Sequence, residues 1–101
     1  MMLLTKELEK QFEKQGDTSQ NELEDTKVIA KFFLSGTGWT WYAFEYDPTT
    51  KIFFGCVHGT YTELGSFSLE ELKEVRDPVF GLGVERDMYF YGEPAINHKH
   101  Y

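Results

Sequence analysis

The residues best suited to chemistry form a charged run near the C-terminus, Glu85-Arg86-Asp87. In a strand, alternate side chains share a face, so the two carboxylates would point one way and Arg86 the other. The simplest interpretation is an ion-pair network that joins this segment to Arg76 or Lys73. Such a network is structural and carries no reaction.

The same carboxylates suggest a second interpretation, a divalent metal site. Together with Glu45 or Glu63 they would provide the clustered oxygen ligands that hard cations prefer. A metal-dependent hydrolase or nuclease is therefore the alternative to a binding function, and it requires these side chains to converge in one pocket. The pattern assigns no catalytic residue, metal or cofactor.

Other reactive residue types are sparse. Cys56 and His58 lie two positions apart and would stand side by side on a strand, and no third group orients them as a nucleophile and its base. His98 and His100 lie near the end of the chain, where solvation is the simpler expectation. Residues 81–83 (Gly-Leu-Gly) lack the full spacing of a phosphate-binding loop and indicate a turn.

Composition limits the class of protein. The chain has 101 residues, which suits one domain spanning residues 1–101, and a net charge of −7, which opposes direct binding to nucleic acid. One cysteine fits a reducing compartment, and no apolar run is long enough to cross a membrane. The charged residues Lys6, Glu7, Glu9 and Lys10 interrupt the N-terminal segment and do not fit a secretory signal, so a cytoplasmic protein is expected.

Acidity is concentrated early in the sequence. Between Glu7 and Asp25 there are seven acids and two lysines, a balance of −5. One interpretation is a solvated face that keeps the protein soluble. The other is a surface, centred on Glu22, Glu24 and Asp25, that competes with nucleic acid for a basic groove on another protein.

An aromatic run offers a second candidate surface. Residues 39–46 read Trp-Thr-Trp-Tyr-Ala-Phe-Glu-Tyr, so neither face of a strand here would be polar. Both faces are then covered by protein, or one is open to a partner. Alternation places Trp39, Trp41 and Ala43 on one face and Tyr42, Phe44 and Tyr46 on the other.

Local signals place the surrounding elements. Thr5 and Gly16 mark the ends of a helix, and Ser68 begins a capping box whose helix stops near Arg76. Gly55 indicates a bulge or a ring lying over the backbone, and residues 63–65 indicate a bend before the second helix. The expected strands cover residues 28–34, 39–46, 52–58 and 84–91, followed by a loose tail over residues 92–101. The fold class is therefore α+β: an antiparallel sheet of about four strands, namely a three-strand meander plus a C-terminal strand, with two helices packed on it.

Several blocks of sequence carry a family resemblance. They are residues 3–8, Trp39-Thr40-Trp41, Phe54-Gly55 ahead of Gly59, residues 63–72 and residues 84–90. In these blocks, over nearly its whole length, the chain resembles a bacterial family catalogued as domain of unknown function 2958. The resemblance implies an accessory protein of plasmids and other mobile genetic elements. It implies no enzymatic activity.

The favoured hypothesis is a non-enzymatic acidic protein that occupies a surface on a host protein, as an anti-CRISPR or other anti-defence inhibitor does. A regulator of element transfer and replication, acting as a dimer through the aromatic strand, is a further alternative. The protein is expected to be a monomer or homodimer with a protein partner, without direct contact to nucleic acid or membrane. The candidate partner-binding residues are Glu22, Glu24, Asp25, Trp39, Trp41, Tyr42, Glu45, Glu63, Glu85, Arg86 and Asp87.

Overall fold

The first helix, α1 (Lys6–Gln15), begins and ends where the sequence predicts. Thr5 Oγ1 accepts a hydrogen bond of 3.2 Å from the N–H of Leu8, which satisfies one of the free donors at the helix start. Gly16 adopts a φ of 65°, and its N–H donates to the carbonyl of Phe12 to close the last turn. Leu8 is half-buried and Phe12 is buried, so this side of α1 packs on the protein.

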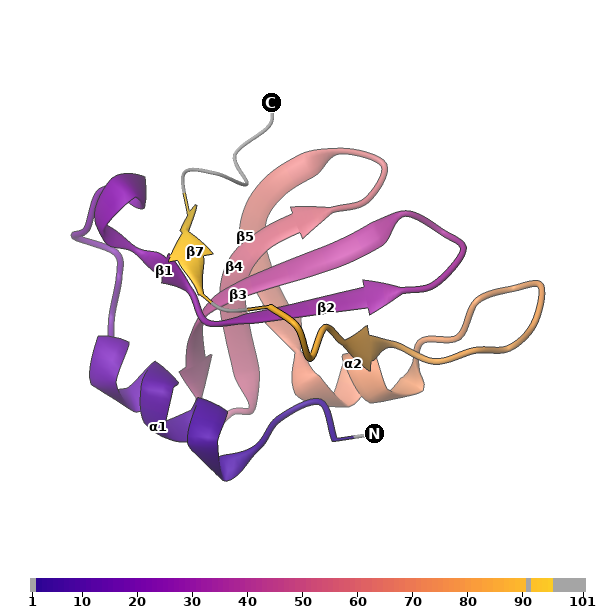
Figure 1. Cartoon of the computed structure of the whole chain (residues 1–101), viewed down its shortest axis with the longest axis horizontal. Helices are drawn as coiled ribbons and strands as arrows, with labels where there is room; N and C mark the ends of the chain where they lie inside the picture. Colours follow the sequence, from indigo (N-terminus) through magenta and orange to yellow (C-terminus); the bar gives the residue numbers. More distant parts are fainter. Residues whose placement is uncertain (1, 91, 96–101) are drawn as a thin grey trace.

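The computed structural model describes residues 2–90 and 92–95. Its main sheet has five antiparallel strands in the order β5–β4–β3–β2–β6, and a separate two-stranded sheet pairs β1 with β7 (Figure 1). After α1, the elements are η1 (Leu23–Asp25), β1 (Lys27–Val28), β2 (Ala30–Leu34), β3 (Trp39–Asp47), β4 (Ile52–His58), β5 (Thr62–Ser68), α2 (Leu69–Glu74), β6 (Glu85–Arg86) and β7 (Glu93–Pro94).

The second helix, α2, starts at the predicted cap. Ser68 Oγ accepts hydrogen bonds from the N–H groups of Glu70 and Glu71, at 3.1 and 3.3 Å. Leu69 and Leu72 are buried, and the helix ends at Glu74, slightly earlier than expected. No helix within residues 2–90 and 92–95 is long and apolar enough to span a membrane.

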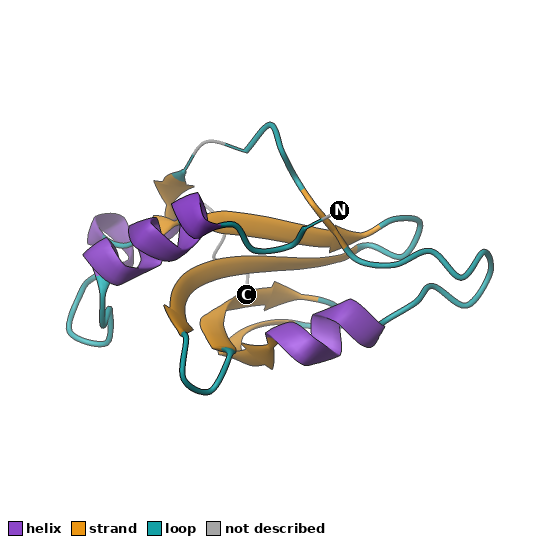
Figure 2. Ribbon diagram, turned by 90° about the horizontal axis from the view of Figure 1, so that it is seen from below, coloured by secondary structure: helices purple, strands orange, loops and turns teal. Residues whose placement is uncertain are grey.

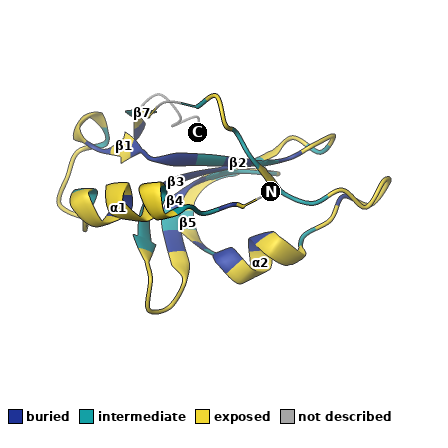
Figure 3. Cartoon of the chain, turned by 60° about the horizontal axis from the view of Figure 1, so that its bottom comes forward, coloured by how far each residue is buried: buried dark blue, intermediate teal, exposed yellow. Residues whose placement is uncertain are grey.

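Both helices cover the same face of the main sheet (Figure 2), and buried positions gather between them and the strands (Figure 3). Aromatic rings fill this space. The ring of Phe53, which has no exposed surface, lies 4.7 to 5.7 Å from the rings of Phe12, Phe32, Tyr46 and Phe67. Each ring pair adds about 0.5–1.5 kcal/mol beyond the area that it buries.

The opposite face of the sheet carries a smaller core. Val28, Tyr42, Phe44, Cys56 and Ala95 are buried there. Residues of η1, β1 and β7 pack beside β3 at this end, and the N–H of Ala95 donates to the carbonyl of Thr26 at 2.7 Å. Both faces of β3 are therefore covered for most of its length.

The structure confirms the α+β class and the meander, and it adds a strand that the sequence did not predict. Residues 63–65, expected as a bend, lie inside β5, which pairs with β4 along its whole length. Phe67 is the only buried residue of β5, so the strand lacks the apolar alternation by which strands are recognised.

The expected C-terminal strand over residues 84–91 is mostly absent. Only Glu85 and Arg86 pair with β2, because Asp87 turns the chain: its Oδ1 accepts a hydrogen bond from the N–H of Tyr89 at 2.9 Å. The expected loose tail is also partly ordered, since Glu93–Pro94 forms β7 against β1. Residues 96–101, with His98 and His100, lie outside the described part of the chain.

The expected first strand is divided in two. Val28 pairs with β7, whereas Ala30 begins the pairing with β3, so residues 28–34 do not form the single strand that was expected. Val28 belongs to the smaller core and Ile29 to the larger one. Because β1 has only two residues, the break between β1 and β2 does not show in the hydrophobic pattern.

Candidate functional site

A β-bulge in β3 decides which way its carboxylate points. The pairing with β4 shifts between Ala43 and Glu45, so Phe44 is the extra residue. Opposite the bulge lies Gly55, where a Cβ atom would stand 1.9 Å from the carbonyl oxygen of Tyr42. The backbones approach this closely only because residue 55 is glycine. The bulge expected at Gly55 within β4 therefore lies opposite it, in β3.

The bulge reverses the alternation of the strand. Tyr46 was expected to share a face with Tyr42, but it pairs with Phe53 and packs in the larger core under the helices. Glu45 consequently lies on the other face, on the side of Phe44 and Phe54. A two-residue period carried through the bulge assigned Tyr46 to the wrong face.

Glu45 holds the loop that follows α1. Its Oε2 accepts a hydrogen bond of 3.0 Å from the N–H of Thr18 and a shorter one from the Thr18 hydroxyl. Thr18 is buried, with 6% of its surface exposed. Gln15 adds a second tie, because its Nε2 donates to the carbonyl groups of Phe44 and Lys27 at 2.7 and 2.9 Å.

Two adjoining hollows lie between this loop, β3 and the outer strands, with volumes of about 520 and 720 Å³. They share four lining residues, so we describe them as one surface, the acidic groove. Phe54 and Leu64 form an apolar part of its lining, and Leu64 is 41% exposed. None of the described residues that line the groove is lysine, arginine or histidine. Its five acidic residues are Glu13, Asp17, Glu22, Glu45 and Asp47.

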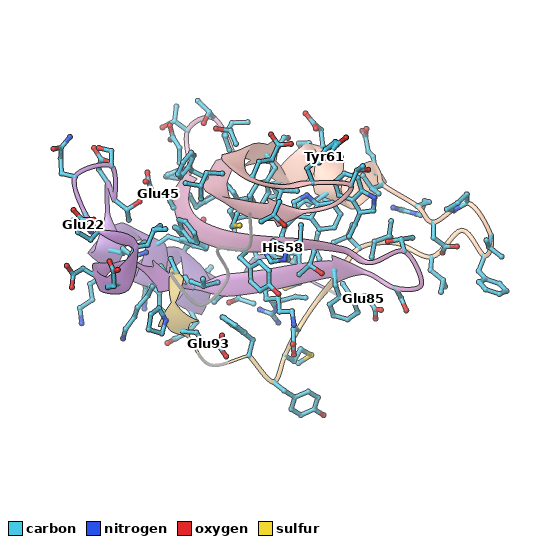
Figure 4. The ribbon with its side chains drawn as sticks, turned by 90° about the horizontal axis from the view of Figure 1, so that it is seen from above. Glu22, Glu45, His58, Tyr61, Glu85 and Glu93 are labelled. Carbon is cyan, nitrogen blue, oxygen red and sulfur yellow. The ribbon has the colours of Figure 1, made fainter. Side chains whose placement is uncertain are left out.

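The five acidic residues give the groove a negative charge. Figure 4 places Glu22 and Glu45 at the same end of the molecule. The N–H of Ser19 donates to Asp17 Oδ1 at 2.8 Å, and this bond, together with a side-chain bond from Ser19, holds the pKa of Asp17 below its ordinary value. Like charges on the wall of a hollow concentrate a negative potential that attracts cationic groups.

Of the three acids singled out in the loop, Glu22 lines the groove, while Glu24 and Asp25 are exposed on η1 beside it. Sequence reasoning did not select Glu13, Asp17 or Asp47 as site residues. The sequence indicated these residues only through the general acidity of the segment. Their position in one groove depends on tertiary packing, which brings α1, the loop and the end of β3 together.

The aromatic strand is not an open binding face. Trp41 and Tyr42 retain only 7% and 9% of their surface, so they cannot provide the direct partner contacts expected of them. Trp39 is 39% exposed, but its ring stacks on that of Trp41 with centroids 6.0 Å apart. It also covers Gly59, where a Cβ atom would lie 2.1 Å from the ring. The hydrophobic effect explains this burial, since the two cores need these rings.

The remaining candidate carboxylates are dispersed. Glu63 lies on β5 and Glu85 on β6, the two opposite edges of the main sheet. Within the described ranges, no group of three or more histidine, cysteine, aspartate or glutamate residues could hold a metal ion. The convergence that a metal-dependent enzyme requires is therefore absent from that part of the chain.

The other two residues of the charged run also separate. Asp87 pairs with Lys31 at 3.6 Å, a half-exposed ion pair that replaces the predicted contact to Arg76 or Lys73. Arg86 lies opposite Phe32 in the sheet and so points to the face that the helices cover.

Cys56 and His58 share a face of β4 but are positioned for packing. Burial raises the pKa of the Cys56 thiol, which opposes formation of the reactive thiolate. His58 makes an edge contact with the ring of Tyr42, with centroids 4.8 Å apart (Figure 4 labels His58). Desolvation is the main cause that raises the pKa of Tyr42, and the charge of Glu93 adds to it.

The chain was compared with known protein families, curated proteins and solved structures. Residues 3–99 match the family described as protein of unknown function DUF2958. No curated protein and no solved structure shows significant similarity to the chain. Because the match covers nearly all of the sequence, the chain belongs to the DUF2958 family.

Proposed function

We propose that this protein binds a basic segment of another protein in the acidic groove, without performing a reaction on it. The observation that supports this proposal is the lining of the groove: among the residues that the structure describes, it combines five acidic residues with exposed apolar surface and contains no basic side chain. Apolar contacts supply burial, and charges supply steering and register.

Glu45 also supports the proposed groove by holding its wall in place. One oxygen of Glu45 accepts both hydrogen bonds from Thr18, so this carboxylate positions the loop that carries Glu22.

The specific form that we propose is anti-defence inhibition. Defence proteins that act on nucleic acid present basic segments to phosphate groups, and an acidic groove that binds such a segment competes with the nucleic acid for it. A gene carried on a mobile element would benefit from this activity, and the protein would then act in the cytoplasm, as a monomer or homodimer. Regulation of element transfer or replication uses the same kind of contact and differs only in the partner.

The proposal is tested by reversing charges in the groove. Glu13 and Glu22 are exposed, so a Glu13→Lys/Glu22→Lys variant is expected to keep the fold. A Glu7→Lys/Glu63→Lys variant changes the net charge equally at exposed positions outside the groove. Tagged wild-type protein captures partners in host cells, and the protein that it captures is identified by mass spectrometry, purified and titrated by calorimetry.

We expect the groove variant to weaken binding at least about tenfold and the control variant to change it less than about threefold. A unit charge pair at 4 Å contributes about 1 kcal/mol in water, and reversal replaces this attraction with a similar repulsion. Equal affinities of the two variants, with unchanged unfolding midpoints, would show that the groove is not the binding surface.

A further inference from the structure

The loop between α2 and β6 exposes large apolar side chains. Residues 78–84 carry no charge in an otherwise acidic chain. Val79 is 76% exposed, Phe80 80% and Leu82 51%. We call residues 77–83 the apolar loop, and Figure 1 shows it extending from one end of the molecule.

A single carboxylate fixes the shape of this loop. Asp77 is 5% exposed, and its Oδ1 accepts hydrogen bonds from the N–H groups of Val79 and Phe80 at 3.0 and 2.7 Å. Its Oδ2 accepts from the N–H of Leu82 at 2.6 Å. The main chain closes the same ring, because Asp77 N–H donates to the Leu82 carbonyl at 2.8 Å and Gly81, with a φ of 69°, donates to the Asp77 carbonyl.

The base of the loop is closed as well. Arg76 and Gly83 form an antiparallel bridge, which holds the two ends of the loop side by side. The Nη1 of Arg76 donates to the carbonyl groups of Lys73 and Val75 at 2.7 and 2.8 Å. The backbone of the loop is therefore ordered by hydrogen bonds, while its apolar side chains face solvent.

We propose that the apolar loop inserts into an apolar pocket on another protein, with Phe80 as its anchor. Exposed apolar side chains gain free energy only when a partner removes them from water. Fixing the loop in advance lowers the conformational entropy lost on binding, and this gain is realised only against a partner of fixed shape. Isolated exposed apolar residues are common on protein surfaces, but three of them on one fixed loop form a patch.

The chemistry of the surroundings favours a protein pocket whose rim carries side chains of both charges. Exposed Glu74 and Glu85 lie two residues outside the Arg76–Gly83 bridge, one on each side, and exposed Lys73 and Arg76 add positive charge at the base of the loop. A bilayer adapts to any apolar shape and is commonly anionic, so neither the fixed loop nor a chain of charge −7 suits it. Insertion of the loop into a second copy of this protein would make a head-to-tail contact. Such contacts produce open filaments unless they close into a ring, so a second copy is not the partner that we propose.

This contact is separate from the acidic groove. The loop after α1 and the apolar loop lie at opposite ends of the molecule (Figure 1), whose longest dimension is 40 Å. The proposal therefore does not depend on the function proposed above, and variants of each surface distinguish the two.

The test replaces Phe80 with the photo-crosslinking residue p-benzoylphenylalanine in the full chain. The control places the same residue at Tyr61, which is similarly exposed at 77%. Irradiation in host cells is expected to join position 80, but not position 61, to one protein. That protein is then purified, and its affinity is measured for wild type and variants by calorimetry.

We expect Phe80→Ala to weaken binding at least about tenfold, as for a central anchor residue, and Tyr61→Ala to leave it within about twofold. Asp77→Asn keeps the apolar side chains but disturbs the loop, and we expect a loss of about threefold or more. Crosslinks only to a second copy or to lipid, no crosslink above the Tyr61 control, or unchanged affinity of Phe80→Ala would each overturn the proposal.

Discussion

Replacing Glu45 by alanine tests whether one carboxylate holds the acidic groove together. The change removes two hydrogen bonds from a charged acceptor and leaves the N–H and hydroxyl of Thr18, which is 6% exposed, without this partner. Hydrogen bonds to charged groups contribute about 1.5–3 kcal/mol each. Because Glu45 is itself only half-buried, water weakens both bonds, and we expect a total loss of about 2–3 kcal/mol, at or just below twice the lower limit.

Two milder substitutions separate the contributions of the hydroxyl bond and of the negative charge to this loss of stability. Thr18→Val removes only the hydroxyl bond and keeps the N–H bond, so we expect about 1 kcal/mol. Glu45→Gln keeps an oxygen acceptor without the charge and is expected to cost a similar amount, because neutral hydrogen bonds are about half as strong. In the Glu45→Ala/Thr18→Val double variant, the two losses should overlap by about 1 kcal/mol.

The assay is urea unfolding followed by tryptophan fluorescence. With an m-value of about 1.5 kcal/mol per molar urea, a loss of 2–3 kcal/mol lowers the midpoint by about 1.5–2 M. Hydrogen exchange provides a second readout, because amides of residues 17–25 should exchange faster in Glu45→Ala. A loss below about 0.5 kcal/mol for Glu45→Ala, or additive losses in the double variant, would refute the reasoning.

Two further predictions concern the bulge and the apolar loop. Gly55→Ala places a Cβ atom 1.9 Å from the Tyr42 carbonyl oxygen, so we expect the free energy of unfolding to fall by about 3 kcal/mol or more. Gly65→Ala is the control: nothing lies within 4 Å of its Cβ atom, and we expect a change within about 1 kcal/mol. Equal urea midpoints for the two variants would contradict this prediction. The hydrogen bond from the Phe80 N–H is the largest cause that holds the pKa of Asp77 below its ordinary value of 3.8, and bonds from Leu82 and Val79 add to it against a partial opposing effect of burial. The stability that ionised Asp77 adds is therefore complete above pH 3.8 and is lost as the pH falls through the lowered pKa. The difference in urea midpoint between wild type and Asp77→Asn should consequently become smaller from pH 7 to pH 3. A difference that does not change with pH would show that the charged hydrogen bonds of Asp77 are not the source of this stability.

The two proposed surfaces would bind through different physical forces. Binding in the acidic groove would depend on long-range charge, so we expect it to weaken with salt. Binding by the apolar loop would depend on short-range burial, so we expect salt to affect it far less. If one partner spans both surfaces, the variants of each will weaken binding independently, because additive effects are expected for distant sites.

Local chemistry in the sequence determined the helices, the turns and the composition of the core. Thr5, Gly16 and Ser68 mark helix ends through hydrogen bonds that reach only two to four residues along the chain. The bounds of β4 agree with the expected strand, since its apolar residues form one uninterrupted run between turn residues. The ring-filled core around Phe53 follows from the aromatic content.

Only the tertiary structure decided where the acids meet and which aromatic rings are covered. The bulge at Phe44 forms because β4 brings Gly55 against β3, and it moves Glu45 to the face where the loop after α1 lies. β5 forms through pairing with β4, although its own side chains are mostly exposed. Such contacts join residues far apart in the chain. A pattern along the sequence does not indicate which distant strand will pair with a given residue.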